Sequence, residues 1–307
     1  MRKSVRATAT WRMFILFYFL FVSVIHGQTV TLKVIETTDV HGAIFPYDFI
    51  NDKPVSGSLA QVAAFVKQER SKAQEVLLLD AGDILQGQPV VYYYNFERPL
   101  VRHLYSRVMN DMGYDAATVG NHDIEAGHLV YDKFVRELNF PWLAANAVKT
   151  SDGKPYFPPY AIIKKAGVKI AILGLITPGI PNWLPQQIWQ GMRFDDMIET
   201  ARKWLPIIQK KKKPDLIIGL FHSGVDPNFG GANSGTPRNE NASQLVAEQV
   251  PGFDVIFVGH DHHGWNFKAP GPRGQSVTIL GASSAARDVA VATIRMEYDK
   301  EHKIWRK

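Results

Sequence analysis

Seven side chains of types that bind metal ions lie in five short motifs, and each motif follows an apolar run. These residues are Asp39, His41, Asp83, Asn121, His222, His260 and His262. The apolar runs, which we predict to be β-strands, are Thr31–Glu36, Val76–Asp80, Ala116–Val119, Leu216–Phe221 and Asp254–Val258. In open α/β sheets a ligand site forms where the carboxyl ends of the strands meet. We therefore expect the seven side chains to converge at one edge.

This set of donors predicts two divalent metal ions. Imidazole, carboxylate and amide donors together suit zinc, manganese or iron better than calcium or magnesium. Two such ions, about 3.5–4 Å apart, acidify a bound water and neutralise charge on a phosphoryl oxygen. Asp83 is a natural bridging ligand because a carboxylate has two oxygens. The chain also lacks a Gly-x-Ser-x-Gly or P-loop pattern, so the residues favour attack of water on a phosphate ester.

Each motif has a simpler explanation when it is taken alone. Asp83 suits a turn or a helix N-cap, and His222 suits a strand end in the core. His122 follows Asn121 directly, so we expect it to face away from the metal and to act on the substrate, stabilising charge or protonating the leaving oxygen. A nearby carboxylate would favour its charged form, and both Asp123 and Glu125 are candidates.

Length and charge limit the possible partners. The chain has 307 residues and is 46% apolar, which allows one large domain or two small ones. Its net charge is +6, but four basic residues and no acidic ones lie in residues 1–27. Without that segment the net charge is only +2, so duplex nucleic acid is not an expected partner.

Residues 1–27 resemble a secretory signal peptide. A basic start precedes the apolar run Met13–Ile25, and the segment ends in a small residue, Gly27. That run is shorter than the ~20 residues needed to span a bilayer. We expect cleavage before Gln28, no stable membrane insertion afterwards, and a periplasmic or secreted protein; the alternative is an uncleaved anchor. The absence of cysteine excludes disulfides and thiolate ligands.

The rest of the chain alternates strands with helices, which predicts a layered α/β fold of two sheets packed face to face with helices outside. The predicted helices are Ser58–Ala73, Leu100–Met112, Leu129–Leu138 and Met197–Lys210. Gly167 lies between two apolar runs and predicts a hairpin of Tyr160–Ile163 with Val168–Ile176. Ser276–Leu280 and Val289–Tyr298 are predicted to form a second pair. The loop 226–241 is long and rich in Gly and Asn, and we expect it to border the active site.

The motifs, in this order, resemble the calcineurin-like metallophosphoesterase superfamily. More narrowly, they are similar to the N-terminal catalytic domain of the exported 5′-nucleotidase, UDP-sugar hydrolase and 2′,3′-cyclic phosphodiesterase family. The resemblance extends from Val30 to Tyr298. The segments that carry it are Thr38–Gly42, Gly82–Gly87, Met112–Ala116, Gly120–Asp123, Val250–Asp254 and Gly259–His262.

The resemblance implies a four-layer αββα sandwich over residues 28–307 and a role for each motif. One metal ion would be held by Asp39, His41, Asp83 and His262. The other would be held by Asp83, Asn121, His222 and His260, with Asp83 bridging the two ions. His122 would be the catalytic histidine, paired with the carboxylate three residues later. That residue is Glu125 here, where the family usually has Asp.

The resemblance also sets the expected activity, which is hydrolysis of nucleotides or related phosphate esters. Family members normally continue into a C-terminal domain that binds the substrate, and we expect the chain, which stops at Lys307, to lack it. A separate chain would then supply substrate binding, or specificity would be broad. Two other functions remain open: hydrolysis of a sulfur ester on the same scaffold, and a non-catalytic subunit that binds metal.

Overall fold

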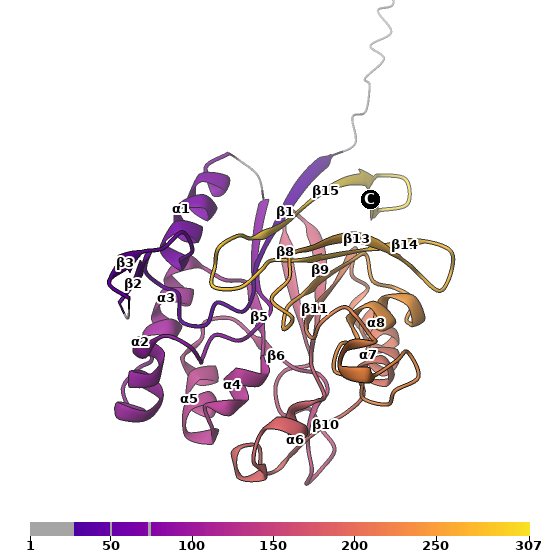
Figure 1. The fold of residues 1–307 in the computed structure, drawn as a ribbon. Helices are drawn as coiled ribbons and strands as arrows, with labels where there is room; N and C mark the ends of the chain where they lie inside the picture. The colour runs from indigo at the N-terminus through magenta and orange to yellow at the C-terminus, as the bar shows by residue number, and fades with distance from the viewer. Residues whose placement is uncertain (1–27, 50, 73–74) are drawn as a thin grey trace, which may run out of the picture.

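The computed structural model describes residues 28–49, 51–72 and 75–307 as two packed sheets with helices on both outer faces (Figure 1). The predicted signal peptide, residues 1–27, lies outside the described residues. No helix among the described residues is long and apolar enough to cross a membrane. The predicted αββα architecture is confirmed.

The first sheet has the strand order β16-β15-β1-β4-β5-β6. Its strands are β1 (Thr29–Thr37), β4 (Glu75–Asp80), β5 (Ala116–Thr118), β6 (Trp142–Leu143), β15 (Ala290–Asp299) and β16 (Ile304–Arg306). The strands β1, β4, β5 and β6 run parallel, so their carboxyl ends share one edge. β15 pairs antiparallel with β1 along almost its whole length.

The second sheet has the order β13-β14-β12-β11-β9-β8. Its strands are β8 (Tyr160–Lys165), β9 (Val168–Ile176), β11 (Leu216–His222), β12 (Val255–Val258), β13 (Trp265–Pro270) and β14 (Ser276–Gly281). The central strands β9, β11, β12 and β14 are parallel. Two short pairs lie outside these sheets: β7 (Ala147–Lys149) with β10 (Met192–Phe194), and β2 (Tyr47–Asp48) with β3 (Lys53–Pro54).

The longer helices form the two outer layers. They are α1 (Leu59–Arg70), α3 (Leu104–Met112) and α5 (His128–Glu137) beside the first sheet, and α7 (Met197–Lys212) and α8 (Ser243–Gln249) beside the second. The shorter ones are α2 (Pro89–Tyr92), α4 (Asn121–Glu125), α6 (Ile180–Trp183), a π-helical turn (Tyr93–Glu97) and 3-10 turns at Gln186–Ile188 and Phe229–Gly231. Ser58 is the N-cap of α1, because its side chain accepts a hydrogen bond from the Gln61 N–H.

Three apolar clusters hold the layers together. The central one lies between the sheets and includes Leu77, Ile170 and Phe257, which are fully buried. The other two join each sheet to its own helices. The sheets therefore present their carboxyl edges side by side, and the Thr118 hydroxyl links them directly by donating to the Leu220 carbonyl.

One predicted strand pair is confirmed and the other is wrong. β8 and β9 form the expected antiparallel hairpin, with Gly167 at a φ of +88° in the turn. Ser276–Leu280 and Val289–Tyr298 do not pair: β14 lies in the second sheet, and β15 pairs with β1 in the first. The intervening segment crosses from one sheet to the other. β15 pairs with a strand that is distant in sequence, and the apolar pattern of β14 and β15 does not specify their partners.

Candidate metal centre

The five predicted strands before the motifs are β1, β4, β5, β11 and β12, and each delivers its side chains to the shared edge. Asp39 and His41 follow β1, and Asp83 follows β4. Asn121 begins α4 just after β5, and His222 is the last residue of β11. His260 and His262 follow β12.

The first group consists of Asp39, His41 and His262. His41 Nε2 and His262 Nε2 lie 3.0 Å apart, and His262 Nε2 is 3.3 Å from Asp39 Oδ1. Asp39 is completely buried, and its Oδ1 has no hydrogen-bond partner among the described residues. A buried carboxylate oxygen without a partner, facing two imidazole nitrogens, matches the donor set of a divalent cation.

The second group joins the two sheets. His222 Nε2 lies 3.2 Å from Asp83 Oδ2 and 3.0 Å from Asn121 Oδ1. His222 Nδ1 donates to the Ala81 carbonyl at 2.7 Å, which fixes the ring and turns Nε2 toward the carboxylate. Asp39, Asp83 and His222 also have donor atoms within 4.8 Å of one another. Asp39 is therefore common to both groups here, whereas the resemblance makes Asp83 the shared ligand.

His260 lies beside these groups but joins neither. Its backbone N–H donates to Asp39 Oδ2 at 2.9 Å, and its ring centre is 5.3 Å from that of His222. Its Nε2 faces Glu240 Oε1 at 3.4 Å, and the indole of Trp183 lies 5.6 Å away at 31°. Glu240 and Trp183 were not predicted as individual residues, although Glu240 belongs to the loop expected to border the site.

The loops that carry the candidate ligands are strained. Asp39, His41, Asp83, His260 and His262 have φ values between +45° and +86°, which side chains other than glycine rarely adopt. Strain of this kind persists where the surrounding structure holds it in place, and it is common at functional sites. Neighbouring glycines leave room for the carboxylates: a Cβ on Gly120 would overlap Asp83 Oδ1.

The charges in the site depend on one another. Burial lowers the pKa of His222, but the ion pair with Asp83 and the charge of Asp39 outweigh burial and raise it to about 10. Burial disfavours the charged form of Asp83, yet the charges of His222, His122 and His41 hold its pKa well below the usual range. The carboxylates of Asp39 and Asp83 thus favour a positive charge at this position, and a bound cation would compete with the His222 proton for it.

His122 pairs with Glu125 and not with Asp123. His122 Nδ1 lies 2.5 Å from Glu125 Oε2. Burial lowers the pKa of His122, but the bond to Glu125 and the charge of Asp83 raise it above its ordinary value. The His122 ring centre is 5.4 Å from that of His41, so the pair borders the first group.

Asp123 has a different task, which the sequence did not reveal. It is completely buried, and its carboxylate accepts hydrogen bonds from four backbone N–H groups. The donors are Asp83, Ile84, Leu85 and Gly120, at 2.7–3.0 Å. Asp123 therefore holds the loop that carries Asp83 against the start of α4.

Among the residues that the structure describes, four histidines lie outside the motifs, and all of them make other hydrogen bonds. His103 is buried and caps α3 by accepting from the Tyr105 N–H. His128 contacts Asp132 and Tyr156, and His302 contacts Asp299. His263 folds back onto the Asp261 carbonyl.

A family model, described as calcineurin-like phosphoesterase, matches residues 32–264. The chain belongs to this family. This phosphoesterase is 30% identical to a 2′,3′-cyclic-nucleotide 2′-phosphodiesterase/3′-nucleotidase of Yersinia enterocolitica, over 86% of this chain and 40% of that protein. It is 32% identical to a 5′-nucleotidase of Vibrio cholerae, over 76% of this chain and 40% of that protein.

Among solved structures, the calcineurin-like phosphoesterase YfkN of Bacillus subtilis superposes with a TM-score of 0.78 and 27% identity. The alignment covers 91% of this chain and 88% of that one. The chain spans about 40% of the length of the Yersinia and Vibrio relatives. The predicted resemblance and the predicted class, a metallophosphoesterase hydrolase, are confirmed.

Proposed function

We propose that this phosphoesterase hydrolyses phosphate esters of nucleotides by attack of water at a centre of two divalent metal ions. The observation that carries the proposal is the buried Asp39 Oδ1, which has no hydrogen-bond partner among the described residues and faces the Nε2 atoms of His41 and His262. The names of the Yersinia and Vibrio relatives support nucleotides as the substrate class.

The residues that would hold the ions are the seven candidate ligands, Asp39, His41, Asp83, Asn121, His222, His260 and His262. Bound divalent ions would supply a hydroxide at neutral pH and would neutralise charge on the phosphoryl oxygens. Zinc, manganese and iron all suit this donor set. The hydrogen bond from His222 to Ala81 orients one ligand, and Asp123 places the loop of another.

His122 would donate the proton that the leaving group needs. As the oxygen of water bonds to phosphorus, the bond from phosphorus to the ester oxygen breaks, and that oxygen takes a proton. Glu125 contacts Nδ1, so Nε2 is the ring nitrogen on the opposite side and would carry the transferred proton. The carboxylate of Glu125 stabilises the charged imidazole before transfer and keeps the ring oriented.

The test measures phosphate release from 5′-AMP by the full chain with added Mn²⁺ or Zn²⁺. A second assay uses bis(4-nitrophenyl) phosphate, with an added phosphatase that releases phosphate from the monoester product. We expect turnover that Asp83→Ala abolishes. Asp299→Ala is the matched control, because Asp299 lies at the far end of β15 from the site. Metal-loaded wild-type protein that hydrolyses neither ester would overturn the proposal.

We also propose that the chain is exported, on the strength of the basic and apolar pattern of residues 1–27. The test is fractionation of cells expressing the full chain, with N-terminal sequencing of the recovered protein. A mature protein that begins near Gln28, outside the cytoplasm, is the expected result. A cytoplasmic protein that keeps Met1 would contradict it.

A further inference from the structure

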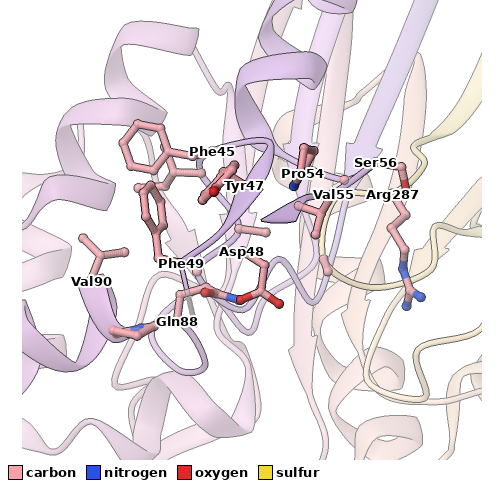
Figure 2. Close-up of a pocket in the computed structure, with 16 residues that line it drawn as sticks. Phe45, Tyr47, Asp48, Phe49, Pro54, Val55, Ser56, Gln88, Val90 and Arg287 are labelled. Atoms are coloured by element: carbon pink, nitrogen blue, oxygen red, sulfur yellow. The ribbon is translucent and has the colours of Figure 1, made fainter. Parts of the chain in front are cut away.

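A cavity of about 860 Å³ opens beside the loop of His41. Its wall carries three aromatic side chains, Phe45, Tyr47 and Phe49. The Phe45 and Phe49 side chains are 47% and 65% exposed. Figure 2 shows these two rings together near Val90, at one side of the cavity. The volume suits a small organic molecule, and neighbouring exposed rings on a soluble protein often mark a binding surface.

The cavity adjoins the backbone that carries the first ligand group. Gly42, which follows His41, lines it, and so does Gln88, whose N–H donates to the His41 carbonyl at 3.2 Å. Ala285 lines it too, and the Ala285 N–H donates to the Asp39 carbonyl at 2.8 Å. Each of these cavity residues is thus bonded or adjacent to a residue of the first ligand group. This position next to the ligand loop makes the cavity a candidate site for the part of an ester that the metal ions do not bind.

The aromatic wall is held in a fixed arrangement. The ring centres of Phe45 and Phe49 are 5.9 Å apart at 90°, and those of Tyr47 and Phe49 are 5.2 Å apart at 61°. The Tyr47 hydroxyl donates to Asp52 Oδ1 at 2.7 Å, which anchors the Tyr47 ring. Rings that are already ordered lose little entropy when a planar group stacks on them.

A second cavity, of about 510 Å³, is lined by His260 and His262 of the metal centre, and its charge is less suitable for an anionic ester. It has aromatic residues as well, Phe229 and Trp265, but its lining includes the carboxylates of Asp226, Glu240 and Asp261. Three carboxylates oppose the entry of an anionic phosphate ester.

The charged lining of the first cavity is different, because it contains the cation Arg287 together with Asp48. The Arg287 Nε and one terminal nitrogen donate to the carbonyl and hydroxyl of Ser284 at 3.0 and 2.7 Å. The guanidinium is therefore fixed beside the cavity, across from Phe45 and Phe49 in Figure 2.

We propose that the pocket lined by Phe45, Tyr47 and Phe49 binds the planar aromatic part of the ester, a nucleobase in a nucleotide, while the metal centre binds the phosphate. This inference rests on the proposed function, because it names the substrate group that the same site selects. The exposed face of Phe49 stacks on the base, and stacking of this kind changes affinity by about 10- to 100-fold.

The experiment compares two monoesters, 5′-AMP and glycerol 2-phosphate, with the metal-loaded full chain. Phe49→Ala should lower the ratio of kcat/KM for AMP to that for glycerol 2-phosphate about tenfold or more, mainly through KM. Phe49→Tyr should restore the ratio, because it keeps an aromatic face. The matched control is Phe229→Ala, since Phe229 is 58% exposed and lines the second cavity. Both variants remove an exposed ring, so melting temperatures check that each remains folded.

Two outcomes would overturn the pocket assignment: an equal loss for both esters in Phe49→Ala, or a selective loss of AMP turnover in Phe229→Ala. If the wild-type chain hydrolyses neither monoester, the kinetic comparison cannot be made and the pocket is tested by binding, whereas the proposed function fails only if bis(4-nitrophenyl) phosphate is not hydrolysed either. Saturation-transfer NMR with adenosine then gives the answer. Transfer that is lost in Phe49→Ala but kept in Phe229→Ala supports the pocket, and no transfer to adenosine in the wild type contradicts it.

Discussion

Asp123 and Asp261 fix the ligand loops of the two sheets, and they do so to different degrees. Asp123 is completely buried and accepts hydrogen bonds from four backbone N–H groups around Asp83. Asp261, between His260 and His262, is only half-buried and accepts from two backbone N–H groups and the Trp265 indole. The loop of Asp83 on the first-sheet side of the centre is therefore held more firmly. The loop of His260 and His262 on the second-sheet side has fewer such hydrogen bonds and lies closer to solvent.

The largest expected effect comes from Asp123→Ala, which leaves four buried N–H groups without a partner. Each unsatisfied buried donor costs about 1–3 kcal/mol, and partial relaxation limits the sum, so we expect a loss of about 4 kcal/mol in the free energy of unfolding. Urea denaturation of the metal-free protein measures it. A loss below about 1 kcal/mol would show that the loop does not depend on this carboxylate.

Glu125→Gln comes next and tests the chemistry on the first-sheet side. The amide keeps the shape but no longer stabilises a charged His122, so we expect kcat to fall about a hundredfold. Metal content should stay at the wild-type level, because Glu125 contacts His122 and none of the candidate ligands. Steady-state kinetics together with metal analysis separate the two effects, and an equal loss of metal would refute the assigned role.

Asp261→Ala is the counterpart of the first substitution and should cost about 1–2 kcal/mol, since water can reach the groups that lose their partner. The same urea titration compares the two variants directly. Equal losses in Asp123→Ala and Asp261→Ala would remove the distinction between the two sides of the centre.

Glu240→Gln should have the smallest effect. Glu240 lies 3.4 Å from His260 Nε2 and is the carboxylate that orients this ring. Residues that orient a ligand typically change metal affinity about 10- to 100-fold, and we expect the lower end because the contact is long. Competition with a chelator measures the affinity. An unchanged metal affinity would show that Glu240 does not orient His260 and only belongs to the loop 226–241 beside the site.

The sequence predicted the parts of this molecule that depend on local pattern. The strands before Asp39, Asp83 and His222 were recognised because apolar runs end at polar side chains, and parallel strand ends must meet at one edge. The Gly167 hairpin was recognised for a similar reason, since its turn lies within the pattern itself. The true partners of β14 and of β15 were not recognised. Strand partners that are far apart in sequence depend on the packing of the whole sheet.

The details of the site were harder to predict for the same reason. Asp123 stands next to His122 in sequence and was one of two candidates to pair with it, yet its carboxylate turns inward to the loop of Asp83. Trp183 contacts His260 across 77 residues of sequence. Such contacts depend on how separate loops come together in space, and no spacing within one motif specifies them.

The pairing of β1 with β15 has a consequence for how the chain folds. β1 precedes the other described strands of its sheet in sequence, but one of its two neighbours is a strand of residues 290–299. The first sheet therefore cannot be completed until residues 290–299 have been synthesised, and contacts of such long sequence separation form slowly. The pairing of β1 with β15 is therefore among the later contacts of the fold to form.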